Sequence, residues 1–306
     1  MKSFIHPLML LLALSAPPTF GSEFPGFLTK FKAFENNPVF RAGNPGEWDE
    51  AIRERGWILK EGDNFYLWYT GYSLPESSEK HLGLATSKNG IHWTRDPRNP
   101  IYSDSWVEDM TVVRRGETYY MFAEGRDDEM QLLSSTDKIH WIHLGKIDVR
   151  KINGTPIPPG PFGTPTVYGE GDVWWLFYER NDEAIWVARS EDLLSWKNVR
   201  DDPVLLPGPD AYDKEMIAMN QVMKIGDRYY ATYHGLKANT RPQEWTTNLA
   251  TSADLLNWEK YENNPILEDN KSSGIFVNDG ERLRLYTMHP EVCLHFSEGD
   301  LPKIEK

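Results

Sequence analysis

The chain has 306 residues, of which 46 are acidic and 33 are basic, giving a formal net charge of -13. This charge argues against nucleic acid as a partner, because a phosphate backbone needs a basic footprint. Twelve Trp, 14 Tyr and 13 Phe beside 23 Gly and 21 Pro favour short strands and many turns over long helices. Cys293 is the only cysteine, so no intrachain disulfide can form and stability must come from packing.

The first residues have the layout of a secretion signal. A cationic Lys2 precedes an apolar run at about 7–16, and the small residues Gly21 and Ser22 follow. The run is too short to span a bilayer. We therefore predict a signal peptide over residues 1–21 and a secreted or periplasmic protein that does not associate with a membrane after cleavage.

One apolar hairpin pattern occurs five times along the chain. The first copy, GWILKEGDNFYLWYTGY at residues 56–72, reads as two strands around a Gly-Asp turn. Every copy centres on Gly followed by Asp or Glu, and these glycines are Gly62, Gly116, Gly171, Gly226 and Gly280. They are spaced by 54, 55, 55 and 54 residues. A period near 50 residues predicts a repeat architecture.

A second element recurs between the hairpins and consists of a strand, a tight polar turn and another strand. In each copy Ser precedes Trp by six residues, and the four copies end at Trp93, Trp141, Trp196 and Trp258. Each repeat therefore carries four strands, which is the sheet of one propeller blade. A sandwich of similar hairpins would not explain why both elements keep one period.

These repeats predict an all-β fold, a single five-bladed β-propeller of four-stranded antiparallel blades over residues 22–306. We expect the regular part to run from about residue 30 to 300, without a second domain. The fifth repeat is shorter at its outer edge. We therefore expect the segment before Trp48, including NPVF at 37–40, to supply the missing strand and close the ring.

The blade pattern resembles the five-bladed propeller glycoside hydrolases, namely the arabinanase and xylosidase group (family 43), the invertase group (family 32) and their relatives. The resemblance rests on the five repeats, on second strands such as YYMF and on the S-x-D-x-x-x-W outer turns. It covers nearly the whole chain after the signal. It implies a catalytic domain, but similar blades also occur in carbohydrate-active proteins that are not hydrolases, and a fold alone does not give function.

Hairpin arithmetic places five residue pairs at one mouth of the central funnel. If each Gly and the next residue form a two-residue turn, the facing pairs are Arg55 with Thr70, Asp109 with Glu124, Thr164 with Glu179, Met219 with His234, and Ser273 with Met288. A slip of one residue would move a side chain to the other face. The predicted rim is rich in ionisable groups: Glu54, Arg55, Glu108, Asp109, Glu124, Arg126, Glu179, Arg180, His234 and His289.

The resemblance implies three carboxylates, one in each of the first three blades, that act as base or nucleophile, as transition-state stabiliser and as general acid. Asp109 matches the second position. Arg55 occupies the first, and Gly163-Thr164-Pro165 replaces the acid-bearing third. Substitutes are Asp49 or Glu54 as base, and Glu179 or Glu215 as acid, each of which could instead form an ion pair. His234 and His289 could act near neutral pH, or simply form hydrogen bonds.

The arginines near the mouth suggest an anionic sugar, since Arg binds carboxylate or sulfate through paired hydrogen bonds. They could equally neutralise the acids of the rim. The residues expected to bind substrate are Trp48, Arg53, Arg55, Glu108, Glu124, Arg126, Arg180 and Gln221.

Three function classes fit the sequence. The leading hypothesis is a secreted glycoside hydrolase that acts on the end of an oligosaccharide or polysaccharide by carboxylate acid/base catalysis. The second hypothesis is a polysaccharide lyase or sugar dehydratase that uses His, Tyr and Arg. It is favoured because two of the three carboxylates implied by the resemblance are absent. The third is a non-catalytic glycan-binding propeller. We expect a monomer with a carbohydrate ligand and no cofactor or catalytic metal, and leave open a structural Ca²⁺ in the funnel.

Overall fold

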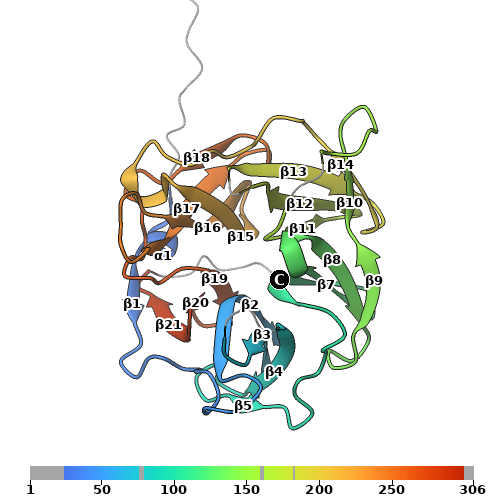
Figure 1. Cartoon of the computed structure of the whole chain (residues 1–306). Helices are drawn as coiled ribbons and strands as arrows, with labels where there is room; N and C mark the ends of the chain where they lie inside the picture. The colour runs from blue at the N-terminus through green and yellow to red at the C-terminus, as the bar shows by residue number, and fades with distance from the viewer. Residues whose placement is uncertain (1–23, 76–78, 159–161, 182, 300–306) are drawn as a thin grey trace, which may run out of the picture.

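The computed structural model describes residues 24–75, 79–158, 162–181 and 183–299, so the predicted signal peptide lies outside the described residues. Within these ranges the strands form five small sheets arranged in a ring around a central axis (Figure 1). This arrangement confirms the five-bladed propeller. No helix in the described ranges is both long enough and apolar enough to cross a membrane.

Blades 1 and 2 each consist of four antiparallel strands that follow one another in sequence, from the axis outward. Blade 1 contains β2 (Ala51–Glu61), β3 (Asn64–Tyr72), β4 (His81–Ser87) and β5 (Thr94–Arg95). Blade 2 contains β6 (Glu108–Arg115), β7 (Thr118–Glu124), β8 (Met130–Ser135) and β9 (Ile142–Lys146), with the short 3-10 helix η1 (Arg126–Asp128) after β7.

Blade 3 departs from the predicted four strands, because β10 (Asp148–Arg150) adds a fifth strand parallel to β14. Its other strands are β11 (Thr166–Glu170), β12 (Val173–Glu179), β13 (Ile185–Ser190) and β14 (Ser195–Asn198). Blade 4 contains β15 (Met216–Ile225), β16 (Arg228–Leu236), β17 (Trp245–Ser252) and β18 (Trp258–Lys260), preceded by the 3-10 helix η2 (Ala211–Asp213).

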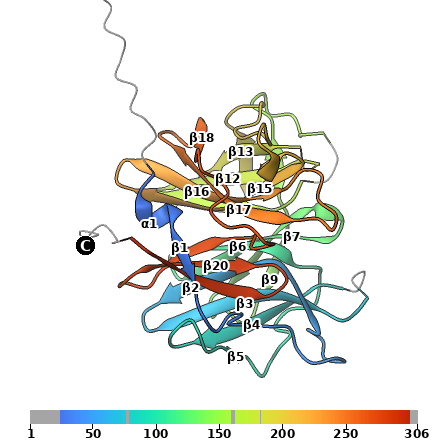
Figure 2. The same ribbon diagram turned by 90° about the vertical axis from the view of Figure 1, so that its left-hand side faces the viewer.

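Both ends of the chain build blade 5. Its first three strands are β19 (Ile275–Asn278), β20 (Leu283–Met288) and β21 (Val292–Ser297), and the fourth is β1 (Phe31–Ala33), which follows the helix α1 (Gly26–Thr29). β1 pairs antiparallel with β21 (Figure 1), and Figure 2 shows β1 directly next to α1. Phe40 of NPVF adds one further bridge, to Val292. The predicted closure by the segment before Trp48 is therefore confirmed.

Packing between blades forms the core. Near the turns, the second strands of blades 1 to 3 alternate half-buried and buried residues, and their remaining residues, toward the carboxyl end, are buried. Buried threonines join neighbouring blades: the Oγ1 of Thr111 donates to Pro165 O (2.8 Å), and that of Thr166 donates to Met219 O (2.7 Å). The indole ring of Trp196 packs edge-on against Phe122 of the preceding blade.

The predicted hairpin register holds near the turns and fails near the axis. The pairs Trp57 with Trp68 and Thr111 with Phe122 keep the predicted register. Beyond them a β-bulge shifts the pairing, so that Glu124 faces Glu108 in place of Asp109. The fifth turn also differs, because four residues, 279–282, separate the paired residues of β19 and β20. Bulges re-aim side chains, and here they lie close to the candidate site.

Candidate active site

Three buried carboxyl groups lie together in blade 2. Glu108 begins β6 and faces Glu124, the last residue of β7, so their side chains are neighbours across the two strands. Asp109 lies in the β6 bulge with φ of 46°, a left-handed conformation that is unusual for a residue other than Gly. All three side chains are buried. Local strain of this kind is common at functional sites.

Burial and mutual repulsion raise the pKa of each of these three carboxyl groups. Burial and the charge of Asp109 raise the pKa of Glu108 to about 7. Burial and the charges of Asp109 and Glu108 raise the pKa of Glu124 well above its usual value, and the carboxylate of Asp128 raises it further. The pKa of Asp109 is also raised by burial, against the opposing effects of Arg55 and Arg53. With a pKa of about 7, Glu108 is therefore partly protonated near neutral pH, as a general acid must be.

Arg53 and Arg55 provide the positive charge beside these carboxyl groups. The Nε of Arg53 lies 3.0 Å from the Oε2 of Glu108 and forms an ion pair with it. The side chain of Arg55 is fully buried at the axis, and its backbone N–H donates to the Oδ1 of Asp109 (3.3 Å). The guanidinium of Arg55 donates to Asp109 O (2.5 Å), Pro165 O (2.7 Å), Met219 O (2.8 Å), Asn220 O (3.1 Å) and Thr166 Oγ1 (2.6 Å).

Arg55 thus ties blade 1 to blades 2, 3 and 4. Its burial contradicts the expectation that it contacts a substrate. The charge remains relevant to the site, because it favours the ionised form of Asp109. Arg55 is therefore a structural residue that also acts electrostatically on the cluster.

Blade 3 completes the cluster with Glu179 and with backbone N–H groups. The N–H of Thr164 donates to the Oε2 of Glu124 (2.8 Å), and the N–H of Gly163 donates to the Oε1 of Glu179 (2.7 Å). A Cβ at position 163 would lie 2.1 Å from the Oε2 of Glu124 and 3.0 Å from the Oε1 of Glu179. Glu124 of blade 2 and Glu179 of blade 3 therefore reach the same stretch of backbone, Gly163-Thr164.

His234 of blade 4 is buried and carries no charge near neutral pH. Burial and the charges of Arg55 and His289 lower the pKa of His234 to about 3. The Nδ2 of Asn220 donates to Nδ1 of His234 (2.9 Å), which leaves the ring proton on Nε2. The expected titration of His234 near pH 7 is therefore contradicted. His289 is half-buried in the connection after β20.

Two other sequence candidates, Asp49 and Glu215, have partners outside the cluster. Asp49 is buried, but the Tyr69 hydroxyl (2.9 Å) and the Nε of Arg95 (2.8 Å) both donate to its Oδ2. Glu215 is exposed, and its Oε1 accepts the backbone N–H of Asn239 (2.9 Å). The side chain of Glu54, which lies in β2, is outside the described atoms.

Gln221 connects two blades. Its Nε2 donates to Phe276 O (3.0 Å), and its Oε1 accepts the Phe276 N–H (2.7 Å). Both polar ends are therefore engaged with the backbone of blade 5, which contradicts the expected role in substrate binding. Trp48 is half-buried and packs beside Tyr69 and His81, with Gly71 close against its ring.

The two remaining arginines lie at the surface of blades 2 and 3. Arg126 forms an ion pair with Glu79, and its guanidinium lies 5.0 Å from the centroid of the Trp106 ring. The guanidinium of Arg180 lies 5.4 Å from the ring centroid of Trp186. Arg53, Arg55 and Arg126 thus have acceptors or countercharges within the protein.

Two further side chains, those of Trp106 and Lys80, act on Glu108. The Nε1 of Trp106 donates to the Oε1 of Glu108 (2.7 Å). The Nζ of the fully buried Lys80 lies 3.7 Å from the ring centroid of Tyr72 and 4.7 Å from that of Trp106, and its charge lowers the pKa of Glu108. The sequence marks Trp106 only as an aromatic residue that could stack on a sugar ring. No local signal marks Lys80, because the preceding connection brings it to the site.

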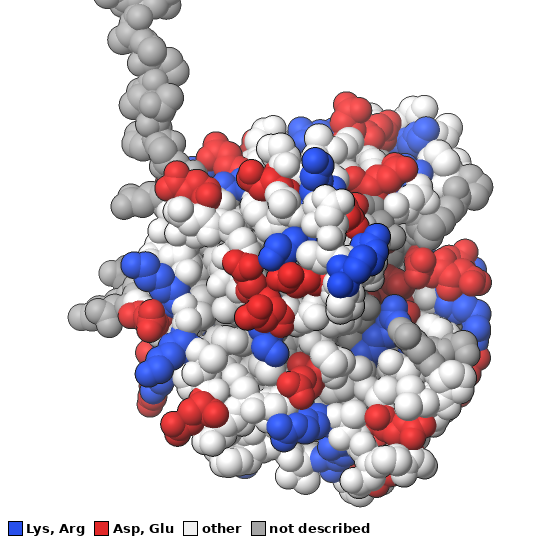
Figure 3. Space-filling model, turned by 60° about the vertical axis from the view of Figure 1, so that its left-hand side comes forward, with Lys and Arg blue, Asp and Glu red and all other residues white. Residues whose placement is uncertain are grey.

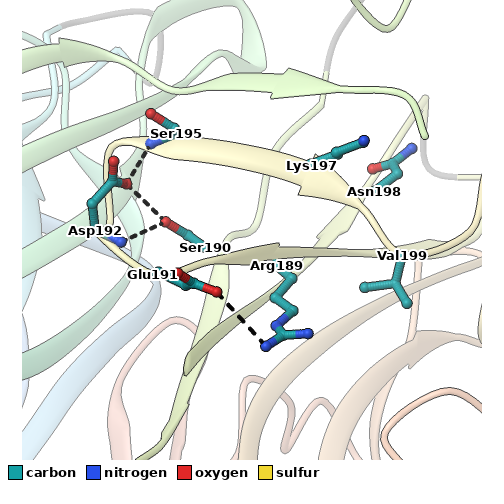
Figure 4. A pocket seen from close by; sticks show the side chains of 8 residues that line it. All are labelled: Arg189, Ser190, Glu191, Asp192, Ser195, Lys197, Asn198 and Val199. Atoms are coloured by element: carbon teal, nitrogen blue, oxygen red, sulfur yellow. Dashed lines mark hydrogen bonds and ion pairs between the residues drawn. The ribbon is translucent and has the colours of Figure 1, made fainter. Parts of the chain in front are cut away.

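Other surface features do not point to a second catalytic centre. A hollow at the outer turn of blade 3 contains Ser190, Asp192 and Ser195, whose hydrogen bonds close the turn itself (Figure 4). Acidic and basic side chains are interspersed on the face drawn in Figure 3. Among the described residues, no group of three His, Cys, Asp or Glu side chains could hold a metal ion.

No model of a known protein family matches the sequence. An uncharacterized protein of Mycobacterium tuberculosis is 27% identical over 222 residues, which are 65% of this chain and 72% of the relative. A 1,2-beta-oligomannan phosphorylase of Thermoanaerobacter sp. is 23% identical over 231 residues, 69% of this chain and 74% of the relative. A sucrose-6-phosphate hydrolase of Escherichia coli is 26% identical over 219 residues, 64% of this chain and 43% of the relative.

Solved structures extend the similarity over most of the chain. A glycosyl hydrolase from Bacteroides ovatus superposes with a TM-score of 0.73 at 14% identity, covering 90% of this chain and 95% of that one. The β-1,2-mannobiose phosphorylase of Listeria innocua gives 0.65 at 16% identity, covering 87% and 96%. A thermostable family-43 glycoside hydrolase gives 0.58 at 18% identity, covering 84% and 91%. The chain therefore has the five-bladed propeller fold of glycoside hydrolases, as its sequence pattern predicted, and sugar phosphorylases share this fold.

Proposed function

We propose that this protein is a glycosidase whose catalytic groups are the buried carboxyl groups of blade 2. The observation that carries the proposal is the cluster of Glu108, Asp109 and Glu124, in which burial raises every pKa and Arg53 and Arg55 supply the opposing charge. Hydrolysis of a glycosidic bond needs one carboxylic acid and one carboxylate beside the scissile bond. The fold shared with glycoside hydrolases supports the same assignment.

Each carboxyl group receives a role from its surroundings. Glu108, with a pKa of about 7, retains enough proton at neutral pH to protonate the leaving-group oxygen. Asp109 receives the charges of two arginines, which favour the carboxylate that stabilises a developing oxocarbenium ion. The raised pKa of Glu124 favours its protonated form, and its Oε2 accepts the Thr164 N–H. It can therefore donate a hydrogen bond to a sugar hydroxyl.

The charge of the substrate can be inferred from the partners of the arginines near the site. The support for an anionic sugar weakens, because Arg55 is buried and Arg53 forms an ion pair with Glu108. We therefore propose a neutral oligosaccharide, cleaved from its end because one funnel closes around the site. We also retain export as a proposal, which mass spectrometry of the mature N-terminus would test.

The test is a screen of neutral and uronate-bearing oligosaccharides for new reducing ends. The purified protein and its Glu108→Gln variant are assayed in parallel at pH 6. We expect cleavage of a neutral sugar by the native protein and a loss of at least about a hundredfold in the variant, since general acid catalysis contributes about 10²–10⁴-fold. Products that absorb in the ultraviolet would instead indicate a lyase or dehydratase. Binding without any product would indicate a glycan-binding propeller.

A sugar phosphorylase is the second candidate. It is favoured because phosphorylases occur both among the sequence relatives and among the superposed structures. In that reaction inorganic phosphate, rather than water, attacks the anomeric carbon, so the same acid serves both. Turnover that requires phosphate and yields a sugar 1-phosphate would establish the phosphorylase. Turnover that is independent of phosphate would establish the hydrolase.

A further inference from the structure

A hollow of about 500 Å³ opens beside the carboxylate cluster. Its walls come from the connection that leads into blade 2, from the bend after β7 and from the outer strand β9. Its volume lies within the range of about 300–1,000 Å³ that is usual for small-molecule sites. Neither the proposed catalytic roles nor the comparisons assign a role to this hollow.

Two residues in the wall of the hollow adjoin the proposed catalytic groups. Trp106 lines it and donates its indole N–H to Glu108, while Gly125, also in the wall, directly follows Glu124. The inner wall is held in place by Gln131, whose Oε1 accepts the hydroxyl of Ser105 and whose Nε2 donates to Trp106 O. A sugar chain cleaved at Glu108 can therefore extend over Trp106 into the hollow.

The charges in the hollow favour a neutral ligand. The hollow contains two exposed ion pairs, Arg126 with Glu79 and Lys146 with Glu129, and the charges cancel within each pair. The exposed carboxylates of Asp104 and Asp127 therefore give the hollow a net negative charge. These two carboxylates repel an anionic sugar, and they are suitable acceptors for sugar hydroxyls. The hydroxyls of Ser103 and Ser105 add further hydrogen-bonding groups.

The ring of Trp106 can be uncovered at low cost. Arg126 lies over this ring, but the side chains of Arg126 and Glu79 are 53% and 57% exposed. An exposed ion pair contributes roughly 0–1 kcal/mol, so a ligand can displace Arg126 easily. The freed indole face then offers an apolar surface to a sugar ring, as aromatic side chains do in binding sites.

We propose that this hollow is a subsite for a second, neutral sugar unit, which stacks on Trp106 and hydrogen-bonds to Asp104 and Asp127. The inference rests on the proposed glycosidase function and makes the substrate a disaccharide or longer. Trp106 would then be both the platform for the second sugar and a positioning residue for Glu108.

The test compares substrates with and without a second sugar. Mannobiose, xylobiose and arabinobiose are assayed beside the glycosyl fluorides of the same sugars, which carry no second unit. In Trp106→Ala and in the Asp104→Ala, Asp127→Ala double variant, we expect the ratio of kcat/KM for disaccharide to kcat/KM for fluoride to fall about tenfold or more. The matched control is Lys224→Ala, which removes the exposed Lys224–Glu170 ion pair elsewhere and should leave the ratio unchanged.

The possible results separate the two proposals. If the native protein cleaves disaccharides and the variants keep the native ratio, the subsite is overturned while the glycosidase stands. If the native protein cleaves none of these substrates, the glycosidase is overturned, and calorimetric binding of the same disaccharides decides on the subsite. Binding at least tenfold weaker to the variants than to the native protein supports the subsite, whereas equal binding or no binding overturns it.

Discussion

Blades 1 and 4 contain the same polar network, and blade 2 contains one without a counterpart. In blade 1 the Tyr69 hydroxyl and the Nε of Arg95 donate to Asp49, and the Nδ2 of Asn99 donates to the Tyr69 hydroxyl (3.3 Å). In blade 4 the corresponding residues are Tyr233, Lys260, Asp213 and Asn264, and the Asn264 to Tyr233 distance is again 3.3 Å. A network that recurs in two blades is part of the scaffold.

This repetition gives a means to separate structural from catalytic acids. The sequence made Asp49 a candidate base. In blade 4, however, its counterpart Asp213 accepts hydrogen bonds from the same kinds of partner, a Tyr hydroxyl and a basic side chain. The group of Glu108, Asp109 and Glu124 joins β6 and β7 of one blade to the axial Arg55, and its carboxyl groups have raised pKa values. We therefore expect substitutions in the repeated network to affect stability, and substitutions in the blade 2 cluster to affect turnover.

The largest expected effect is that of Asp109→Asn on turnover. The carboxylate interacts most strongly with the charge of the transition state, so kcat on a cleaved disaccharide should fall about a thousandfold, or about 4 kcal/mol. Thermal unfolding should remain cooperative, which shows that the fold is retained. Near-native turnover would show that Asp109 is a structural residue, like Asp49 and Asp213. The distinction between the blade 2 cluster and the repeated network would then no longer hold.

Arg55→Lys should cause the largest loss of stability. A lysine Nζ cannot serve the five acceptors that the guanidinium joins across blades 2, 3 and 4. We expect the free energy of unfolding to fall by about 3 kcal/mol, as is usual when a buried charge loses its partners. Arg53→Lys, at a half-buried site, is the matched control and should cost less than about 1 kcal/mol. Equal losses would show that Arg55 does not hold the blades together.

Asp49→Asn and Asp213→Asn should each lower the free energy of unfolding by about 1–3 kcal/mol while turnover is maintained. Asp213→Asn should cost more, because its partner Lys260 is 17% exposed whereas Arg95, the partner of Asp49, is 35% exposed. Chemical denaturation and kcat on the same substrate measure both effects. A large loss of turnover in Asp49→Asn alone would restore Asp49 as a catalytic base.

The pH dependence should identify Glu108 as the acid. With a pKa of about 7, the protonated form is lost above pH 7, and kcat/KM should fall about tenfold per pH unit there. Glu108→Gln should abolish this alkaline limb, whereas Glu215→Gln, at an exposed position, should keep it. If the limb persists in Glu108→Gln, another group is the acid.

Stability should respond to Glu108 with a defined sign. The folded protein holds a proton on Glu108 up to about pH 7, while a free glutamate releases it near 4.5. The stabilisation is therefore fully present below pH 4.5 and is lost as the pH rises to 7. Glu108→Gln should flatten this part of the stability profile, measured by denaturation between pH 4 and 8.

The sequence by itself determined the blade count, the turns, the ring closure and the placement of Asp109 near the axis. These features depend on strand periodicity and on turn glycines, all of which act over a few residues. Four of the five hairpin turns have the predicted length, and the exception is the turn at 279–282.

Only the tertiary structure decided which ionisable groups meet and what they do. Arg55 occupies the position at which the family resemblance implies a catalytic base, yet its hydrogen-bond partners lie 54, 110, 111, 164 and 165 residues away, and these contacts bury it. The bulges that make Glu108 face Glu124 and the neutral state of His234 arise in the same way. Burial and the electrostatic field at a residue depend on neighbouring blades, and no local pattern in the sequence contains that information.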